Sequence, residues 1–149
     1  MNSTPSRKTL DILLVEDSDT DALFASEAFA ESKLAHRLHL VEDGVKAITF
    51  LRRQAPYAAA PRPDLILLDL NLPKKNGFEV LAEIKADEDL RVIPVIILTT
   101  SSADGDLLKS YQLHANAYLT KPSGLEAYAE TAAAIERFWF SCATLPYRA

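Results

Sequence analysis

The sequence predicts an α/β fold: a doubly wound (βα)5 three-layer sandwich in which a five-stranded parallel sheet lies between two layers of helices. Short aliphatic runs recur along the chain, as expected of strands that are covered on both faces. Segments with an apolar residue at every third or fourth position lie between these runs and are typical of amphipathic helices. Because the two patterns alternate along 149 residues, one compact domain with its own core is expected.

Five segments are predicted to be strands. Four are apolar runs: Ile12–Val15, Leu65–Leu68, Val95–Leu98 and the weaker Ala117–Leu119. The remaining segment, His36–Glu42, alternates apolar with polar residues. This period of two is typical of a half-exposed strand, so we expect it at an edge of the sheet.

A helix is predicted after each strand. The first begins at Ser18, whose hydroxyl can cap it, with Asp21 three residues further on. Every helix is expected to turn one apolar face to the sheet. These faces comprise Ala22, Ala25 and Phe29; Val45, Ile48 and Leu51 after Asp43-Gly44; Phe78, Leu81 and Ile84 after Gly77; Leu107, Leu108 and Tyr111 after Asp104-Gly105; and Leu125, Tyr128, Ala132, Ile135 and Trp139 in a last helix from Leu125 to Phe140.

A single domain is expected over residues 10–141, with an N-terminal tail at 1–9 and a C-terminal tail at 142–149. The Pro/Ala-rich segment Gln54–Asp64 is expected to be a surface connection within this domain. Since few residues follow Trp139, we expect no DNA-binding output domain after it.

Composition and charge exclude several classes of protein. Apolar residues make up 48% and charged residues 25% of the chain, as in ordinary globular proteins. The net charge of −5 argues against nucleic-acid binding. No apolar run approaches the roughly 20 residues that cross a bilayer, so no membrane association is expected. The N-terminus lacks a signal peptide's apolar core, and the single cysteine, Cys142, cannot form an internal disulfide, so a cytoplasmic location is expected.

Polar side chains follow the predicted strands at their carboxyl ends. Glu16 and Asp17 follow the first apolar run, Asp69 the second, Thr99 the third and Lys121 the last. Because ligands of open α/β sheets bind at this edge, we expect these side chains to form one site. Three carboxylates against one ammonium leave a charge of about −2, which is costly to bury without a cation. The pattern therefore predicts a divalent cation, Mg²⁺ above all.

These residues, with the loop NLPKKNG (Asn71–Gly77), resemble the receiver domain of two-component response regulators over roughly Leu10–Trp139. The resemblance implies a flavodoxin-like sheet with the strand order 2-1-3-4-5. It also implies a phosphorelay function: a sensor histidine kinase donates a phosphoryl group to this chain, which switches its protein contacts. Such a protein assists its own phosphorylation and dephosphorylation but is not an enzyme.

The resemblance further implies a role for individual residues. These roles are Asp69 as the phosphorylation site; Glu16, Asp17, Asp69 and the backbone carbonyl of Asn71 as Mg²⁺ ligands; Thr99 and Lys121 as the hydroxyl and the cation that bind the phosphoryl group; Tyr118 as the aromatic switch; and a cis peptide bond before Pro122.

Elementary chemistry is consistent with these roles. A carboxylate attacks phosphorus poorly unless the charge of its target is screened, and Mg²⁺ with Lys121 would screen it. An acyl phosphate on Asp69 adds roughly one further negative charge and three acceptor oxygens. Thr99 can donate its hydroxyl to these oxygens, which vacates space into which Tyr118 can turn. The result would be a two-state switch.

Three functions other than that of a receiver domain would also place an aspartate or a phosphate site at this edge of the sheet or use the same fold without phosphorylation. A phosphohydrolase similar to the haloacid-dehalogenase-like phosphatases would use Asp69 as nucleophile but needs a second Asp two residues on, where Asn71 stands. A flavin-binding module needs a Ser/Thr/Gly-rich phosphate cradle where this chain has the acidic EDSDTD. A phosphorylation-independent docking module has no need of Asp69, Thr99 and Lys121. Taken alone, Glu16-Asp17 is also an ordinary acidic cluster at a helix N-terminus.

A finer resemblance concerns partners. The segments VEDG, LNLPKKNG, LTTSS and IERFWF are similar to those of single-domain regulators paired with bacterial and cyanobacterial phytochrome kinases, which implies a light-sensing kinase as the donor. Phe138, Trp139 and Phe140 exceed what one helix face can bury, which indicates an interface. The family resemblance implies a homodimer through the fourth helix, fifth strand and fifth helix.

Overall fold

The computed structural model describes residues 9–32 and 34–146 and confirms the predicted α/β sandwich. Most of the predicted N-terminal tail and the last three residues of the predicted C-terminal tail lie outside the described residues. The elements are β1 (Leu10–Val15), α1 (Asp19–Ala30), β2 (His36–Val41), α2 (Gly44–Leu51), β3 (Leu65–Leu68), α3 (Gly77–Ala86), β4 (Val95–Thr99), α4 (Asp104–Gln112), β5 (Ala117–Thr120), α5 (Leu125–Ile135) and a π-helical segment, η1 (Glu136–Cys142).

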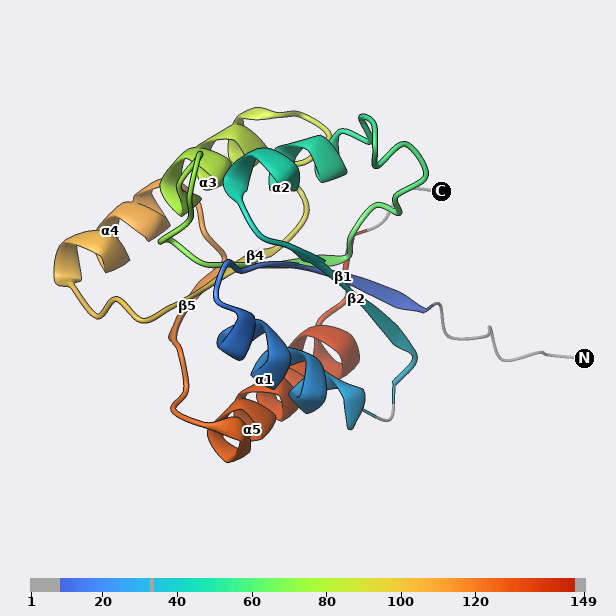
Figure 1. Cartoon of the computed structure of the whole chain (residues 1–149), viewed down its shortest axis with the longest axis vertical. Coiled ribbons are helices and arrows are strands. Elements are labelled where there is room, and N and C mark those ends of the chain that lie inside the picture. The colour runs from blue at the N-terminus through green and yellow to red at the C-terminus, as the bar shows by residue number, and fades with distance from the viewer. Residues whose placement is uncertain (1–8, 33, 147–149) are drawn as a thin grey trace, which may run out of the picture.

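The sheet is parallel throughout, with the predicted strand order β2-β1-β3-β4-β5. Figure 1 shows α1 and α5 together on one side of the sheet and α2, α3 and α4 on the other. No helix among residues 9–32 and 34–146 is both long and apolar enough to cross a bilayer.

The core forms two layers, one on each side of the sheet. The side chains of Leu13 and Val15 point to the layer under α2 and α3, and those of Ile12 and Leu14 to the layer under α1 and α5. This alternation explains why the central strands are aliphatic at every position. Each such fully buried aliphatic side chain contributes roughly 1.5–3 kcal/mol to stability.

Short polar residues cap the first three helices, α1, α2 and α3, whereas α4 and α5 follow Ala103 and Gly124 without a side-chain cap. Ser18 accepts the Asp21 N–H at 3.3 Å at the start of α1, and Asp43 accepts the Lys46 N–H at 2.7 Å at the start of α2. At α3, Asn76 forms a complete capping box with Glu79. Since a cap is worth about 1 kcal/mol, these residues determine where the chain leaves the strand ends and turns into helix.

The structure corrects the prediction for the C-terminus. The α-helical part of the last helix ends at Ile135, and the residues to Cys142 form η1 instead of continuing to Phe140. Leu125 is exposed, although the predicted apolar stripe included it. The hydrogen bonds of a π-helix span one residue more than those of an α-helix, so a pattern based on 3.6 residues per turn fails there.

A second correction concerns α4. The helix is present, but Leu107, Leu108 and Tyr111 are 38%, 60% and 46% exposed, and Ser110 is the residue that is buried. The apolar spacing correctly predicts a helix. It does not show whether the partner of the apolar face is the chain's own sheet or another molecule.

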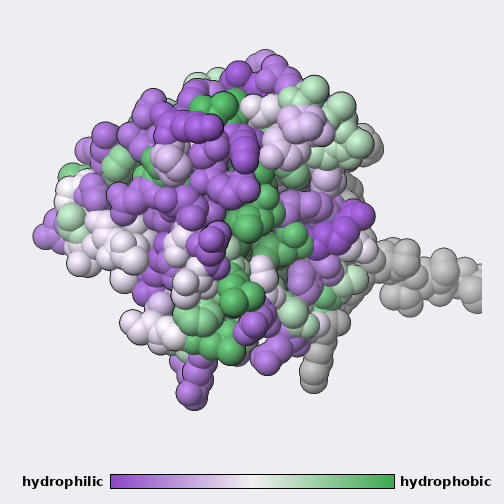
Figure 2. Space-filling model, in the orientation of Figure 1, coloured by the Kyte–Doolittle hydropathy of each residue, from purple (hydrophilic) through white to green (hydrophobic). Residues whose placement is uncertain are grey.

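Apolar surface is also exposed far from α4, near the β2 edge of the sheet. Figure 2 shows a largely hydrophilic face on which apolar residues gather between α1 and the β2 edge of the sheet. Leu23 of α1 and Leu40 of β2 are both exposed. The half-exposed β2 confirms the predicted edge strand.

Candidate functional site

The register of the sheet brings Glu16 and Asp69 together. Val15, the last residue of β1, pairs with Leu68, the last residue of β3. The two acidic residues therefore emerge side by side, and both are buried, with exposed fractions of 3% and 4%. The prediction that these carboxylates meet at one edge of the sheet is confirmed.

Lys121 lies at the centre of this group. Its backbone N–H donates to the Thr99 carbonyl at 2.7 Å, which fixes the end of β5 beside the end of β4. Its Nζ lies 2.7 Å from Glu16 Oε1, 2.9 Å from Asp69 Oδ2 and 3.1 Å from Asp21 Oδ2. The Asp21 contact is not among the predicted site contacts, since the two residues are 100 positions apart in the sequence.

The pKa values in this group reflect burial opposed by pairing. Burial raises the pKa of Glu16 to about 7; the hydrogen bond from Lys121 opposes this shift and the charge of Asp69 adds to it. Burial alone would lower the pKa of Lys121, but its hydrogen bonds to Glu16 and Asp69 outweigh burial and raise that pKa. Lys121 therefore remains a cation at neutral pH, and a metal ion would hold Glu16 in its ionised form.

Three carboxylates form a candidate metal centre. Glu16, Asp17 and Asp69 each offer one oxygen, and these oxygens lie within 4.8 Å of one another. Glu16 and Asp69 are buried, whereas Asp17 is exposed. Carboxylate oxygens at a partly open edge are the ligands that Mg²⁺ prefers, because it retains several waters. The donor set fits a divalent cation.

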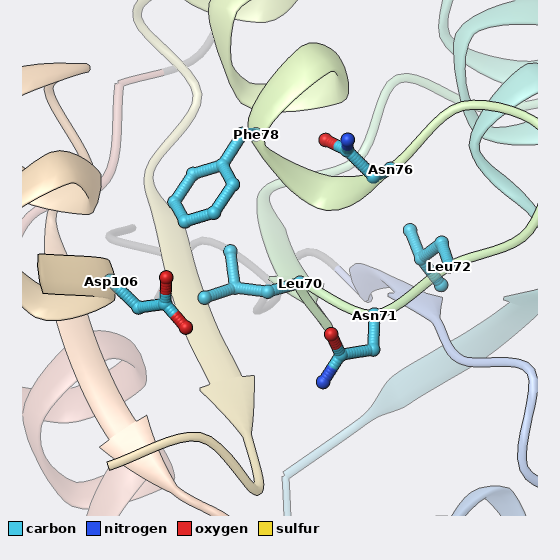
Figure 3. A pocket seen from close by; sticks show the side chains of 6 residues that line it. All are labelled: Leu70, Asn71, Leu72, Asn76, Phe78 and Asp106. Carbon is cyan, nitrogen blue, oxygen red and sulfur yellow. The ribbon is translucent and has the colours of Figure 1, made fainter. Parts of the chain in front are cut away.

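Asn71 lies next to this centre. Its backbone N–H donates to Asp69 Oδ1 at 3.2 Å, so the loop after β3 helps to orient that carboxylate. A pocket of about 480 Å³ opens beside Asn71, between this loop and α4 (Figure 3). Its lining is apolar or amide except for one carboxylate, and consists of Leu70, Asn71, Leu72, Asn76, Phe78 and Asp106.

The predicted switch residues meet at Ser101. Thr99 is fully buried, and its hydroxyl accepts the Ser101 N–H at 3.3 Å. The hydroxyl of Tyr118 donates to the Ser101 carbonyl at 2.8 Å, and the Ser101 hydroxyl donates to Asp106 of α4 at 2.6 Å. The loop after β4 thus connects the site to β5 and to α4.

One expectation at the site is wrong. The peptide bond between Lys121 and Pro122 is trans, and the cis bond among the described residues is Ala55-Pro56. The two isomers of an X–Pro bond differ by only about 0.5–1 kcal/mol, so the presence of a proline does not decide between them.

Comparison with known proteins decides the family. The chain matches the model of the response regulator receiver domain over residues 12–133. The chain belongs to this family. As a receiver domain it is a two-component signalling protein, and phosphorylation of an aspartate by a histidine kinase is the mechanism of its family.

Individual receiver domains are similar over most of their length. Response regulator Rcp1 of Synechocystis is 50% identical over 135 residues, which cover 91% of this chain and 92% of the relative. The phosphorylated cyanobacterial phytochrome response regulator RcpA has a TM-score of 0.90 and 49% identity, covering 94% of this chain and all of RcpA. The Mn²⁺-bound form of Rcp1 has a TM-score of 0.87 and 49% identity, covering 93% and 99% of the two chains.

Proposed function

We propose that this receiver domain accepts a phosphoryl group from a sensor histidine kinase on Asp69. Mg²⁺ would be held by the carboxylates of Glu16, Asp17 and Asp69 and by the backbone carbonyl of Asn71. The observation that carries the proposal is the Lys121 ammonium at 2.9 Å from Asp69, beside a cluster of carboxylate oxygens that suits a divalent cation.

The residues of the chain have separate roles in this reaction. An oxygen of Asp69 forms a bond to phosphorus while the bond from phosphorus to the donor histidine nitrogen breaks, and the nitrogen keeps the electron pair. Lys121 donates N–H groups to the phosphoryl oxygens, and Thr99 donates its hydroxyl to one of them. Bound Mg²⁺ would supply further charge neutralisation. Through Ser101, a displacement of Thr99 would reach Tyr118, the proposed aromatic switch.

Removal of the metal is the most direct test. We expect acetyl phosphate with Mg²⁺ to add one phosphoryl group to the protein, located on Asp69 by mass spectrometry, and we expect EDTA to reduce this labelling to background. Labelling that is unchanged in EDTA would refute the metal role of Glu16 and Asp17. Continuous release of phosphate from unrelated phosphoesters would favour the phosphohydrolase alternative, and absence of any labelling would favour the docking module.

We further propose a phytochrome kinase as the phosphodonor. The proposed location is the cytoplasm, where the exposed thiol of Cys142 would stay reduced. The similarity to RcpA, a cyanobacterial phytochrome response regulator, supports this donor. Phosphotransfer from purified candidate kinases to this chain would identify it. A phytochrome kinase that transfers no faster than an unrelated kinase would contradict the proposal.

A homodimer through α4, β5 and α5 is the proposed assembly, and the exposed apolar residues of α4 support it. Leu108, at 60% exposure, is the most exposed of them. Leu108→Glu is expected to weaken dimerisation at least about tenfold, because a charge would have to be desolvated in the interface. Leu23→Glu changes a leucine of α1 that is exposed to a similar degree, 55%, and serves as the control. Sedimentation that shows equal dimerisation of both variants would refute this interface.

A further inference from the structure

Asp21 occupies a place in the site that the proposed chemistry does not use. Its Oδ2 accepts a hydrogen bond from the Lys121 ammonium at 3.1 Å, and its Oδ1 accepts one from the Tyr128 hydroxyl at 3.1 Å. Lys121 and Tyr128 are nearly inaccessible, with exposed fractions of 5% for the lysine side chain and 3% for the tyrosine. Asp21 therefore joins α1, the end of β5 and α5 through two buried partners.

The capping-box bond to the N-cap N–H does not account for the orientation of Asp21, although the Ser18 side chain also interacts with its carboxylate. Ser18 is the N-cap of α1, which puts Asp21 at the position where an acidic side chain ordinarily accepts the N-cap N–H. In this structure the Ser18 N–H donates to Glu16 Oε2 at 3.1 Å instead. The carboxylate of Asp21 points toward Lys121 and Tyr128.

The number of donors on Lys121 gives Asp21 a distinct role. An ammonium has three N–H donors, and three carboxylates lie within 3.1 Å of it. Two of them, Glu16 and Asp69, belong to the candidate metal centre, and Asp69 is also the proposed phosphorylation site. Of the three, Asp21 alone lies outside that centre, so its contact can persist while the other two carboxylates serve the reaction.

The hydroxyl of Tyr128 holds Asp21 from the other side. The tyrosine ring is buried and packs against Phe24 of α1, with ring centroids 5.8 Å apart, which restricts the position of its hydroxyl. Because each oxygen of Asp21 is hydrogen-bonded to a buried partner, the bond to Tyr128 can hold Asp21 in place, and Asp21 can in turn restrict the motion of Lys121. This restriction matters because a small displacement of a charged group can slow a reaction severalfold to about 100-fold.

From this arrangement we infer that Asp21, anchored by Tyr128, is a positioning residue that holds the Lys121 ammonium beside Asp69 and thereby sets the rate of phosphorylation. The inference rests on the proposed function of the site. The affected step is the one in which an oxygen of Asp69 bonds to phosphorus while the donor departs with the electron pair of the broken bond.

The test compares Asp21→Asn, Tyr128→Phe and their combination with the wild type. The maximal rate of labelling by acetyl phosphate at saturating Mg²⁺ is expected to fall about tenfold in Asp21→Asn and about threefold in Tyr128→Phe. The double variant is expected to be no slower than Asp21→Asn, because both changes break one chain of contacts. Asp19→Asn removes an exposed carboxylate from the same helical turn and is expected to have no effect.

A second measurement needs neither metal nor phosphoryl donor. Carbon-13 relaxation of the Lys121 Cε group in the metal-free protein is expected to show larger motion in Asp21→Asn and Tyr128→Phe than in the wild type and Asp19→Asn. Tyr128→Phe retains every charge, so a slower rate in this variant cannot be a loss of electrostatic attraction for Mg²⁺. Thermal unfolding establishes that each variant is folded, and Tyr128→Phe alone tests the inference if Asp21→Asn does not fold.

Two results would overturn the inference. One is an Asp21→Asn variant that binds Mg²⁺ more weakly but keeps the wild-type maximal labelling rate and the wild-type motion of the Lys121 Cε group. Asp21 would then act only through its charge. The other is normal labelling and normal Lys121 motion in both single variants. In either case a wild type that is labelled on Asp69 leaves the proposed function intact, whereas a wild type that is not labelled refutes the proposed function itself.

Discussion

Asp69→Asn is expected to lower Mg²⁺-dependent labelling by acetyl phosphate by a factor on the order of 10³ or more, to background. The amide cannot act as the nucleophile that forms the acyl phosphate. The fold should persist, because an amide oxygen can still accept the Lys121 N–H that Asp69 accepts at 2.9 Å. Loss of the Asp69 charge also removes a repulsion that contributes to the raised pKa of Glu16. Mass spectrometry of intact protein measures labelling, and urea unfolding measures stability.

Asp19→Asn makes the same chemical change on an exposed residue and should be labelled at the wild-type rate. Survival of labelling in Asp69→Asn would assign the phosphoryl group to another residue, and peptide mapping would then locate it. A loss of labelling that is accompanied by unfolding would instead show that Asp69 supports the fold.

Gly77→Ala is expected to destabilise the protein by about 3 kcal/mol and to slow labelling. A Cβ at Gly77 would lie 2.2 Å from the Asp69 carbonyl oxygen and 2.6 Å from the Leu70 Cα. Both are backbone atoms at or next to the proposed phosphorylation site, Asp69, so relief of the clash must move α3 or the end of β3. Urea unfolding measures the change in the free energy of unfolding, and acetyl phosphate labelling measures the change in the rate of phosphorylation.

Gly105→Ala is the matched control. No atom lies within 4 Å of a Cβ at this position, which is in the first turn of α4. Here the substitution should stabilise the protein by about 0.5–1 kcal/mol, since alanine loses less backbone entropy in a helix than glycine. Equal effects of the two substitutions would show that the close approach of Gly77 to Asp69 does not constrain the fold.

The alternating pattern of the sequence is enough to predict the sandwich and most of the site. Strands buried on both faces must be aliphatic at every position, so Ile12–Val15 and Leu65–Leu68 are recognisable without a structure. The carboxyl ends of parallel strands share one edge, so the residues that follow them, Glu16 and Asp69, are predictably close.

Other features depend on contacts between distant parts of the chain. Asp21 resembles any acidic residue in a first helical turn until the fold places Lys121 and Tyr128 against it. The apolar face of α4 has the same spacing whether it packs inward or remains exposed, and the structure leaves it exposed.

Periodicity along the sequence thus determined the elements, their order and the edge at which the chemistry collects, because these follow from local geometry and the burial of apolar surface. Tertiary structure alone decided which carboxylates share the Lys121 ammonium, which isomer Pro122 adopts and where the last α-helix gives way to η1. The physical reason is that these outcomes depend on small energy differences between alternatives, and such differences are settled by neighbours that are remote in sequence.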